Sequence, residues 1–267
     1  MSSEDYLQKN KDAWNKKTAL HLQSAFYDQP GFLKGRSSLN KIELDLLGDV
    51  KGKTILHLQC HFGQDSISLA RLGAQVTGVD FSDAAIATAS LTALQTGVEA
   101  KFICSDIYDL SSVLNGQFDI VFTSYGTIGW LPDMDKWAAV VGHFLKPGGV
   151  FVFVEFHPVV WMFDNDFKKI SYDYFKADPI IEIENGTYAD KEATITTETV
   201  SWNHSISEVV KSLLSQNLRI MAIDEYDYSP YSCFNNVIEQ EPGKFRIAHL
   251  ENKIPMVYAI KAFKENQ

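Results

Sequence analysis

Short apolar runs alternate with longer segments in which apolar residues recur at helical spacing, and this alternation dominates the first 156 residues. Short apolar runs are typical of buried strands, and a 3.6-residue apolar period is typical of helices that lie on a sheet. The predicted strands are 54–58, 75–79, 100–104, 118–124 and 150–154, and the predicted helices are 65–72, 82–97 and 132–144. Strands that alternate with helices in this way predict a parallel sheet covered by helices.

Both ends of the chain add elements to this alternating core. Residues 3–27 form a predicted helix that a turn at 28–31 ends, and residues 39–47 form a second helix. Near the other end, Ser205 and Glu208 have the spacing of a capping box, which predicts the start of another helix. A strand at 218–223 and a final strand at 256–263 follow that helix.

Residues 158–204 interrupt the alternation with aromatic and β-branched residues around the turn pair Asn185 and Gly186. This composition predicts an antiparallel hairpin, and the segment is too short to bury a core of its own. We therefore expect an inserted cap rather than a separate domain. The acidic and phenolic loop at 224–234 either presents polar groups to a ligand or forms solvated surface.

A tight turn, Gln59 to Gly63, joins the first strand to the first helix of the alternating core. Such a turn places free backbone N–H groups and the positive end of a helix dipole at the edge of the sheet, where open α/β folds bind ligands. Asp80 ends the next strand, where a carboxylate can accept hydrogen bonds from a ribose diol. The dinucleotide pattern G-x-G-x-x-G fails, because Gln59, His61 and Gln64 occupy its glycine positions.

The run Ile-Leu-His-Leu-Gln-Cys-His-Phe-Gly resembles the first motif of class I methyltransferases that use S-adenosylmethionine, usually an Asp-x-Gly-x-Gly-x-Gly turn. Other motifs follow in the family's order: the ribose-binding strand end at Asp80, the adenine loop at Asp106, the fourth strand entering Ser124 and Tyr125, and Leu-Lys-Pro-Gly-Gly-Val-Phe before the fifth. The ordered series covers roughly residues 50–156, and the last helix and strands extend the resemblance to nearly the full chain.

The resemblance implies a doubly wound, mostly parallel seven-stranded sheet with helices on both faces and an antiparallel last strand. It also implies one domain, residues 1–267, in which residues 1–47 form a helical lid and residues 158–204 an inserted antiparallel β cap. The implied cofactor is S-adenosylmethionine, and the residues that would hold it are His57, Gln59, Cys60, His61, Gly63, Asp80, Phe81, Ser82, Asp106, Ile107, Ser124 and Tyr125. Gln59 and His61 replace two motif glycines, and His57 stands where an acid is usual.

Candidate catalytic groups lie at the same edge of the predicted sheet. Glu155 and His157 are two residues apart in extended chain, so we expect both to face one pocket. They are the first candidates for acid–base chemistry, with His204 and Tyr125 as further candidates. A histidine before a proline is equally often a turn residue, so a structural role for His157 stays open.

Four aromatic residues are candidates for binding the molecule that is methylated: Trp14, Tyr27, Trp130 and Trp161. An apolar, aromatic surround suits a transfer in which the positive charge on sulfur disappears. The alternative, that these side chains simply pack the lid and cap onto the sheet, is the more common role of aromatic residues. No spacing of His, Cys, Asp or Glu forms a recognisable metal set, so no metal is predicted.

The net charge and the cysteine content limit the classes of partner and the cellular compartment that we expect. A formal net charge of -10 and a pI near 5.1 disfavour a nucleic-acid partner. Three separated cysteines and the lack of an apolar signal or membrane segment predict a cytoplasmic protein without disulfides. We expect a methyltransferase acting on a small molecule; the alternatives are a non-catalytic or regulatory protein that binds S-adenosylmethionine, and a methyltransferase acting on RNA or protein.

Overall fold

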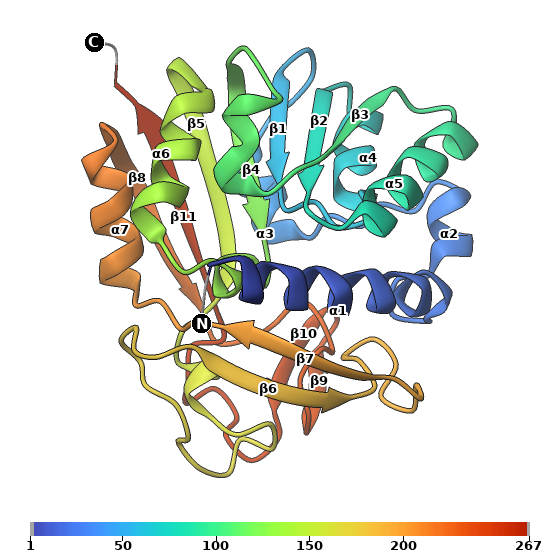
Figure 1. The fold of residues 1–267 in the computed structure, drawn as a ribbon, viewed down its shortest axis with the longest axis vertical. Helices are drawn as coiled ribbons and strands as arrows, with labels where there is room; N and C mark the ends of the chain where they lie inside the picture. Colours follow the sequence, from blue (N-terminus) through green and yellow to red (C-terminus); the bar gives the residue numbers. More distant parts are fainter. Residues whose placement is uncertain (1–2, 266–267) are drawn as a thin grey trace.

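The computed structural model describes residues 3–265 and contains a seven-stranded sheet in the order β3-β2-β1-β4-β5-β11-β8 (Figure 1). The first five strands are parallel, and β11 runs antiparallel to both of its neighbours. The strands are β1 Thr54–Leu58, β2 Gln75–Asp80, β3 Ala100–Cys104, β4 Phe118–Ser124, β5 Leu145–Phe156, β8 Leu218–Tyr226 and β11 Val257–Lys264. The predicted doubly wound sheet with an antiparallel last strand is confirmed.

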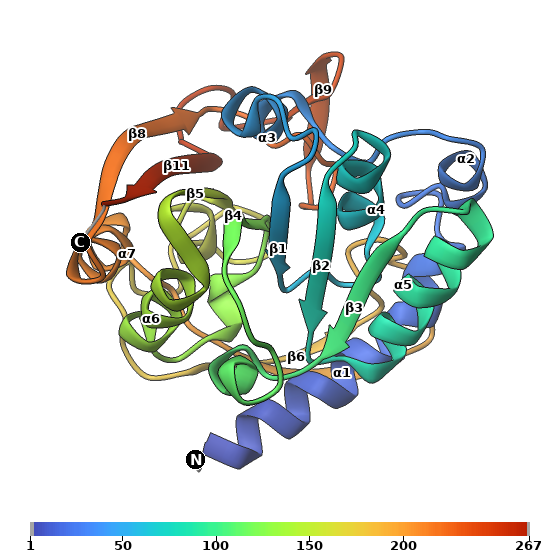
Figure 2. The ribbon, with the colours of Figure 1, turned by 90° about the horizontal axis from the view of Figure 1, so that it is seen from above.

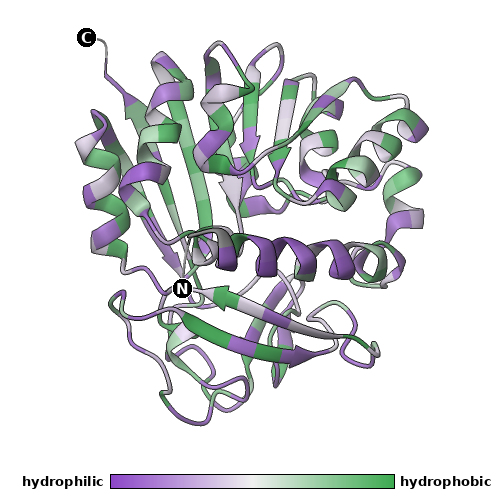
Figure 3. Cartoon of the chain, in the orientation of Figure 1, coloured by the Kyte–Doolittle hydropathy of each residue, from purple (hydrophilic) through white to green (hydrophobic). Residues whose placement is uncertain are grey.

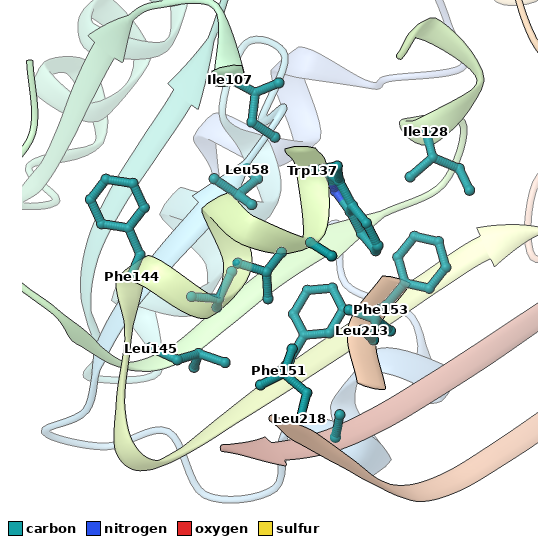
Figure 4. Close-up of a cluster of buried hydrophobic side chains, with 14 of the residues drawn as sticks. Leu58, Ile107, Ile128, Trp137, Phe144, Leu145, Phe151, Phe153, Leu213 and Leu218 are labelled. Carbon is teal, nitrogen blue, oxygen red and sulfur yellow. The ribbon is translucent and has the colours of Figure 1, made fainter. Parts of the chain in front are cut away.

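The sheet is buried on both faces because its central strands send apolar side chains to each side in turn. On β5, Phe151 and Phe153 belong to one core cluster, whereas Val152 and Val154 belong to the other. The first cluster centres on Trp137, whose ring lies 5.6 Å from the ring of Phe151 and 5.4 Å from that of Phe153 (Figure 4). This two-sided core fixes the strand ends that carry the site.

Helices cover both faces of the sheet (Figure 2). Helices α6 and α7 contribute to the cluster around Trp137, and α3 and α4 contribute to the opposite one. The helices are α1 Ser3–Gln23, α2 Gln29–Leu33, α3 Lys41–Leu47, α4 Gln64–Arg71, α5 Asp83–Thr96, α6 Met134–Phe144 and α7 Ile206–Ser215. Among residues 3–265, every helix is too short or too polar to cross a lipid bilayer.

The N-terminal region differs from the prediction of one helix over residues 3–27 followed by a turn. Helix α1 ends at Gln23, where the backbone N–H and the hydroxyl of Ser24 both donate to the His21 carbonyl, at 3.1 and 2.7 Å. The expected turn at 28–31 is instead the start of α2. Asp28 accepts a hydrogen bond from the Gly31 N–H at 3.1 Å, and a proline is tolerated in that first turn.

The predicted inserted hairpin is present as β6, Ile180–Asn185, paired antiparallel with β7, Thr196–Ser201. It lies below the carboxyl edge of the sheet, and the largely hydrophilic α1 runs beside β7 (Figures 1 and 3). The Asn10 side chain joins the two elements, since its amide group donates to the Val200 carbonyl and accepts from the Val200 N–H, both at 2.8 Å.

A second hairpin, β9 Val237–Glu241 with β10 Lys244–Ile247, was not predicted. Most of β9 is exposed and polar, so its sequence lacks the apolar alternation that marks a half-buried strand. Cys60, Cys104 and Cys233 are free thiols, as predicted, although Cys104 is exposed rather than buried.

Candidate active site

A cavity of about 590 Å³ lies between the carboxyl edge of the sheet, α1 and the inserted cap. The turn after β1, the ends of β2, β4 and β5, the lid helix and the β6–β7 hairpin all contribute lining residues. This volume is in the range of cofactor and small-ligand pockets. The position agrees with the rule that open α/β sheets bind ligands beyond the carboxyl ends of their strands.

The turn after β1, residues 59–63, keeps a glycine-like backbone although it carries few glycines. Gln59 and His61 have φ values of 55° and 51°, in the left-handed region that glycine adopts most readily. Gly63, with φ 79°, has no alternative, because a Cβ there would lie 2.7 Å from the Phe102 ring. The turn therefore has left-handed backbone angles at two positions where the motif it resembles carries glycine, and it carries two side chains there.

Asp80, at the end of β2, lines the cavity and holds the turn in place. Its Oδ2 accepts a hydrogen bond from the His61 N–H and its Oδ1 one from the Ser82 N–H, both at 2.9 Å. Burial raises the pKa of Asp80 to about 6. Each carboxylate oxygen can accept a second hydrogen bond, so the group can still receive a vicinal diol. Phe81 lines the cavity beside it, and Ser82 caps α5.

The predicted adenine loop borders a smaller cavity of about 30 Å³, lined by Asp106 and Ile107. This cavity shares Asp80 and Phe81 with the large one, so the two sites are neighbours. The Asp106 carboxylate accepts the Tyr108 N–H at 3.0 Å and caps a short 3-10 helix. Burial raises its pKa. Asp106 therefore has a structural partner in addition to any contact with a nucleoside.

His57 and Cys60 are buried at the inner end of the turn. The His57 ring lies against Phe122 at 4.8 Å, and its Nδ1 lies 2.8 Å from the Ser66 hydroxyl. Burial lowers the pKa of His57 to about 3, so the ring is neutral near pH 7. Burial also raises the pKa of the Cys60 thiol. Neither residue supplies the negative charge that the family motif usually carries on this strand.

Glu155 lines the cavity, but its carboxylate is occupied by the loop after β4. It accepts the Thr127 N–H at 2.7 Å, the Thr127 hydroxyl at 2.8 Å and the Ile128 N–H at 3.2 Å. The N–H groups of Gly126 and Phe156 donate to the other oxygen. With five donors, this carboxylate anchors the loop at 126–128.

His157 does not line the cavity, so the prediction that it shares a pocket with Glu155 is wrong. Its Nε2 lies 2.8 Å from the Glu225 carboxylate on β8, and its Nδ1 accepts the Val159 N–H at 3.1 Å. The extended geometry assumed for the pair ends at Phe156, where β5 ends. His157 therefore joins the edge of the sheet to the start of the insertion.

His204 lines the cavity, but both of its ring nitrogens face acceptors. Nε2 lies 2.8 Å from the Leu131 carbonyl, and Nδ1 lies 3.1 Å from the Glu208 carboxylate. Tyr125, at φ 44°, donates its hydroxyl to Glu43 on α3 at 2.8 Å, and burial raises the pKa of that phenol well above its usual value. Both side chains are thus committed to contacts within the protein.

The predicted aromatic residues do gather at the cavity. Trp14 and Trp130 meet edge to face at 5.5 Å, and Trp130 also donates to the Gly126 carbonyl at 2.7 Å. The hydroxyls of Tyr27 and Tyr188 lie 2.5 Å apart, joining the lid to the cap. Trp161 lines the wall beside Phe156 and remains 39% exposed.

Five polar atoms of cavity-lining residues are buried without a partner in the described part of the chain: Trp14 Nε1, Gln59 Oε1, His61 Nε2, Asn203 Oδ1 and the Tyr258 hydroxyl oxygen. Buried polar groups are rarely left unpaired in native proteins. A bound molecule that supplies hydrogen bonds at this wall would pair them. The residues present therefore fit a polar nucleoside ligand.

Several lining residues were not among the sequence candidates: Lys17, Asp65, Tyr188, Lys191 and Tyr231. Tyr231 comes from the loop at 224–234, which is therefore not only solvated surface, and its hydroxyl accepts from the Asn40 amide at 2.7 Å. Asp65 stands directly after the turn motif, and its place in the first turn of α4 was the one available signal.

The strand order, the turn after β1 and the acid at the end of β2 together define a Rossmann-like methyltransferase fold. Residues 55–149 match the family model of a methyltransferase domain. The fold, and residues 55–149 within it, are thus those of a class I S-adenosylmethionine-dependent methyltransferase domain.

Similar proteins agree with this assignment. A ubiquinone biosynthesis O-methyltransferase of Shewanella pealeana is 32% identical over 136 residues, which cover 49% of this chain and 57% of that protein. The chain thus spans little more than half the length of the curated relatives it matches.

Two solved structures share the fold. An S-adenosylmethionine-dependent methyltransferase from Mesorhizobium loti has a TM-score of 0.57 at 21% identity, covering 86% of this chain and 99% of that one. A geranyl diphosphate C-methyltransferase from Streptomyces coelicolor, in complex with Mg²⁺, geranyl-S-thiolodiphosphate and S-adenosyl-L-homocysteine, has a TM-score of 0.56 at 15% identity, covering 84% and 74%.

Proposed function

We propose that this chain transfers the methyl group of S-adenosylmethionine to a small molecule held between the sheet edge and the inserted cap. The observation that carries the proposal is the position of Asp80 and the His61 N–H on one wall of a cavity whose opposite wall is the cap. Within it, Asp80 and Phe81 would hold the ribose, Asp106 and Ile107 the adenine, and the turn at 59–63 with Ser124 the remaining part of the cofactor.

The bound cofactor supplies a methyl group already activated by a sulfonium, so the protein has to align the acceptor and exclude water. Trp14 and Trp130 form an aromatic wall suited to a centre that loses positive charge during transfer. Glu155 and His204 act as positioning residues in this proposal, because their polar atoms already serve the loop after β4 and the start of α7. Alignment, rather than proton removal by these groups, then supplies most of the rate.

We assign the acceptor to a cavity enclosed by one domain, in which residues 1–47 act as a lid and 158–204 as a cap. Two ion pairs connect lid and cap, Lys9 with Glu198 at 2.5 Å and Lys17 with Glu184 at 3.0 Å. An enclosed pocket suits a small acceptor better than RNA or a protein side chain. The three free thiols fit a reducing compartment, so we place the protein in the cytoplasm.

A second candidate, a non-catalytic protein that binds the same cofactor, is favoured by the side chains of Gln59 and His61 at motif glycine positions. Calorimetry with S-adenosylmethionine and, separately, with NAD tests the cofactor class. A binding isotherm with NAD alone would reject the proposal. Release of S-adenosylhomocysteine across a panel of phenols, amines and carbon acids then tests for transfer. Binding without turnover on any acceptor would favour the second candidate.

A further inference from the structure

The neutral His57 leaves one part of the proposed cofactor without an obvious partner. S-adenosylmethionine carries an α-ammonium on its amino-acid end, and a buried cation needs a carboxylate or several acceptors nearby. The family motif usually places an acid on this strand, but here the residue is a histidine that burial keeps uncharged near pH 7. The ammonium then needs hydrogen-bond acceptors elsewhere in the cavity, and a carboxylate would supply both acceptors and an opposite charge.

Six carboxylates line the cavity: Asp65, Asp80, Glu155, Asp164, Glu182 and Glu184. The last three belong to the cap and have partners there or on the lid. The acceptor positions of Glu155 are occupied by donors of the loop after β4. Asp80 holds the turn and faces the proposed ribose position. Asp65 is the remaining carboxylate, and it stands two residues after Gly63 in the first turn of α4.

The surroundings of Asp65 leave room for a cation. Its Oδ1 accepts the Ser38 hydroxyl at 2.5 Å and its Oδ2 the Ser124 hydroxyl at 3.4 Å, and both serines also line the cavity. An ionised carboxylate can accept about four hydrogen bonds, so about two positions stay open. Asp65 forms no ion pair within residues 3–265. Arg36, whose positive charge lowers the pKa of Asp65, pairs instead with Asp28 at 2.9 Å.

The missing ion-pair partner of Asp65 is reflected in the pKa of its carboxyl group. Burial raises the pKa of Asp65, against the lowering effect of Ser38, Ser124 and the positive charge of Arg36. The negative charge of Asp65 in turn contributes, after burial, to the raised pKa of Glu43, a buried carboxyl on α3. An ammonium placed between Ser38, Asp65 and Ser124 would offset the cost of burying the charge of the Asp65 carboxylate.

We propose that Asp65 is the counter-ion of the cofactor's α-ammonium, with the Ser38 and Ser124 hydroxyls orienting its carboxylate. In this proposal Asp65, in the first turn of α4, takes the place of the acid that the family usually carries on β1. The proposal rests on the proposed function, and it adds the residue that selects an amino-acid-bearing nucleoside over a simple one.

Three ligands separate the contributions: S-adenosylhomocysteine, its des-amino analogue, which lacks only the ammonium, and 5′-methylthioadenosine, which lacks the whole amino-acid end. The wild type should bind S-adenosylhomocysteine at least about tenfold more tightly than the des-amino analogue. Asp65→Asn should weaken S-adenosylhomocysteine binding by about tenfold and change binding of the des-amino analogue by less than about twofold. Calorimetry at fixed ionic strength measures all of these affinities.

The matched control is Asp135→Asn, since Asp135 also lies in the first turn of a helix and accepts one serine hydroxyl, Ser212, at 2.7 Å. It lies away from the cavity and should leave all affinities unchanged. Asp65→Ser, which retains one polar oxygen and removes the charge, repeats the measurement if the asparagine variant does not fold.

Two results would overturn the proposal while leaving the cofactor site intact. One is equal binding of S-adenosylhomocysteine and its des-amino analogue by the wild type. The other is an equal loss for both ligands in the Asp65 variants, which would mean that Asp65 only holds the Ser38 segment. If the wild type binds none of the three ligands, the proposed function fails and this assignment fails with it.

Discussion

The Tyr125 hydroxyl donates a 2.8 Å hydrogen bond to Glu43, a carboxyl that is fully buried beneath the candidate active site. Burial, and next the charge of Asp65, raise the pKa of Glu43 from 4.5 to about 7. The folded protein therefore binds more protons than the unfolded chain between about pH 4.5 and 7, and this group lowers stability as pH rises through that window. The upper limit of the effect is about 3 kcal/mol.

Replacing Glu43 with Gln removes this titration. We expect the free energy of unfolding of Glu43→Gln, relative to wild type, to improve by roughly 2–3 kcal/mol between pH 5 and pH 8. Urea denaturation at several pH values measures it. The exposed Glu99→Gln serves as control and should follow the wild-type pH dependence. Parallel curves for wild type and Glu43→Gln would show that Glu43 ionises normally.

Asp80→Ala should weaken S-adenosylhomocysteine binding by more than about tenfold, because a charge-assisted contact with the ribose is lost. The His61 and Ser82 N–H groups also lose their acceptor, so the turn loosens. Calorimetry measures the affinity, and a thermal melt establishes that the variant is folded. Asp83→Ala, on the exposed side of the same segment, should keep wild-type affinity. Unchanged affinity in Asp80→Ala would remove this residue from the site.

Gly63→Ala should lower stability by roughly 2–4 kcal/mol, because the new Cβ meets the Phe102 ring as well as a left-handed backbone. Gly52→Ala is matched in backbone angle, with φ 73° against 79°, but its Cβ would contact nothing within 4 Å. It should cost only about 1–2 kcal/mol. Chemical denaturation compares the two. Equal losses would mean that Phe102 moves aside at little cost.

The variant Glu155→Gln distinguishes two roles for this carboxylate, holding the loop at 126–128 and acting as a general base. One amide oxygen cannot accept five donors, so we expect a loss of about 1–3 kcal/mol in stability together with reduced transfer. The shape of the pH–rate profile should stay the same. A variant with wild-type stability whose alkaline or acidic limb disappears would instead identify Glu155 as the base.

Two parts of the predicted cofactor site, the turn at 59–63 and Asp80, line the same cavity. The turn at 59–63 and Asp80 lie within one strand–turn–helix–strand unit, so spacing alone brings them to the same edge. His157 was misjudged because the direction of a side chain just past a strand end depends on what packs there, here Glu225 on β8. Tyr188 and Tyr231 come from irregular segments whose path no periodicity describes.

The placement of the inserted cap, like the direction of the His157 side chain, depends on contacts that local sequence does not describe. Its hairpin was predicted from β-branched residues and a turn pair, but its placement over the site depends on α1, nearly two hundred residues away in sequence. The exposed, polar strands of the second hairpin carry no pattern that distinguishes them from a loop. Prediction succeeded where contacts are local and failed where distant segments meet.

The amide of Asn10 pairs with both backbone groups of Val200, as a neighbouring strand would. These two hydrogen bonds join α1 to the β6–β7 hairpin, so we expect a movement of one to carry the other with it. If lid and cap open together, cofactor and acceptor use one entrance, and the ligand that lies deeper, against the strand ends, binds first and leaves last. We then expect steady-state kinetics of ordered binding, in which one ligand is required before the other.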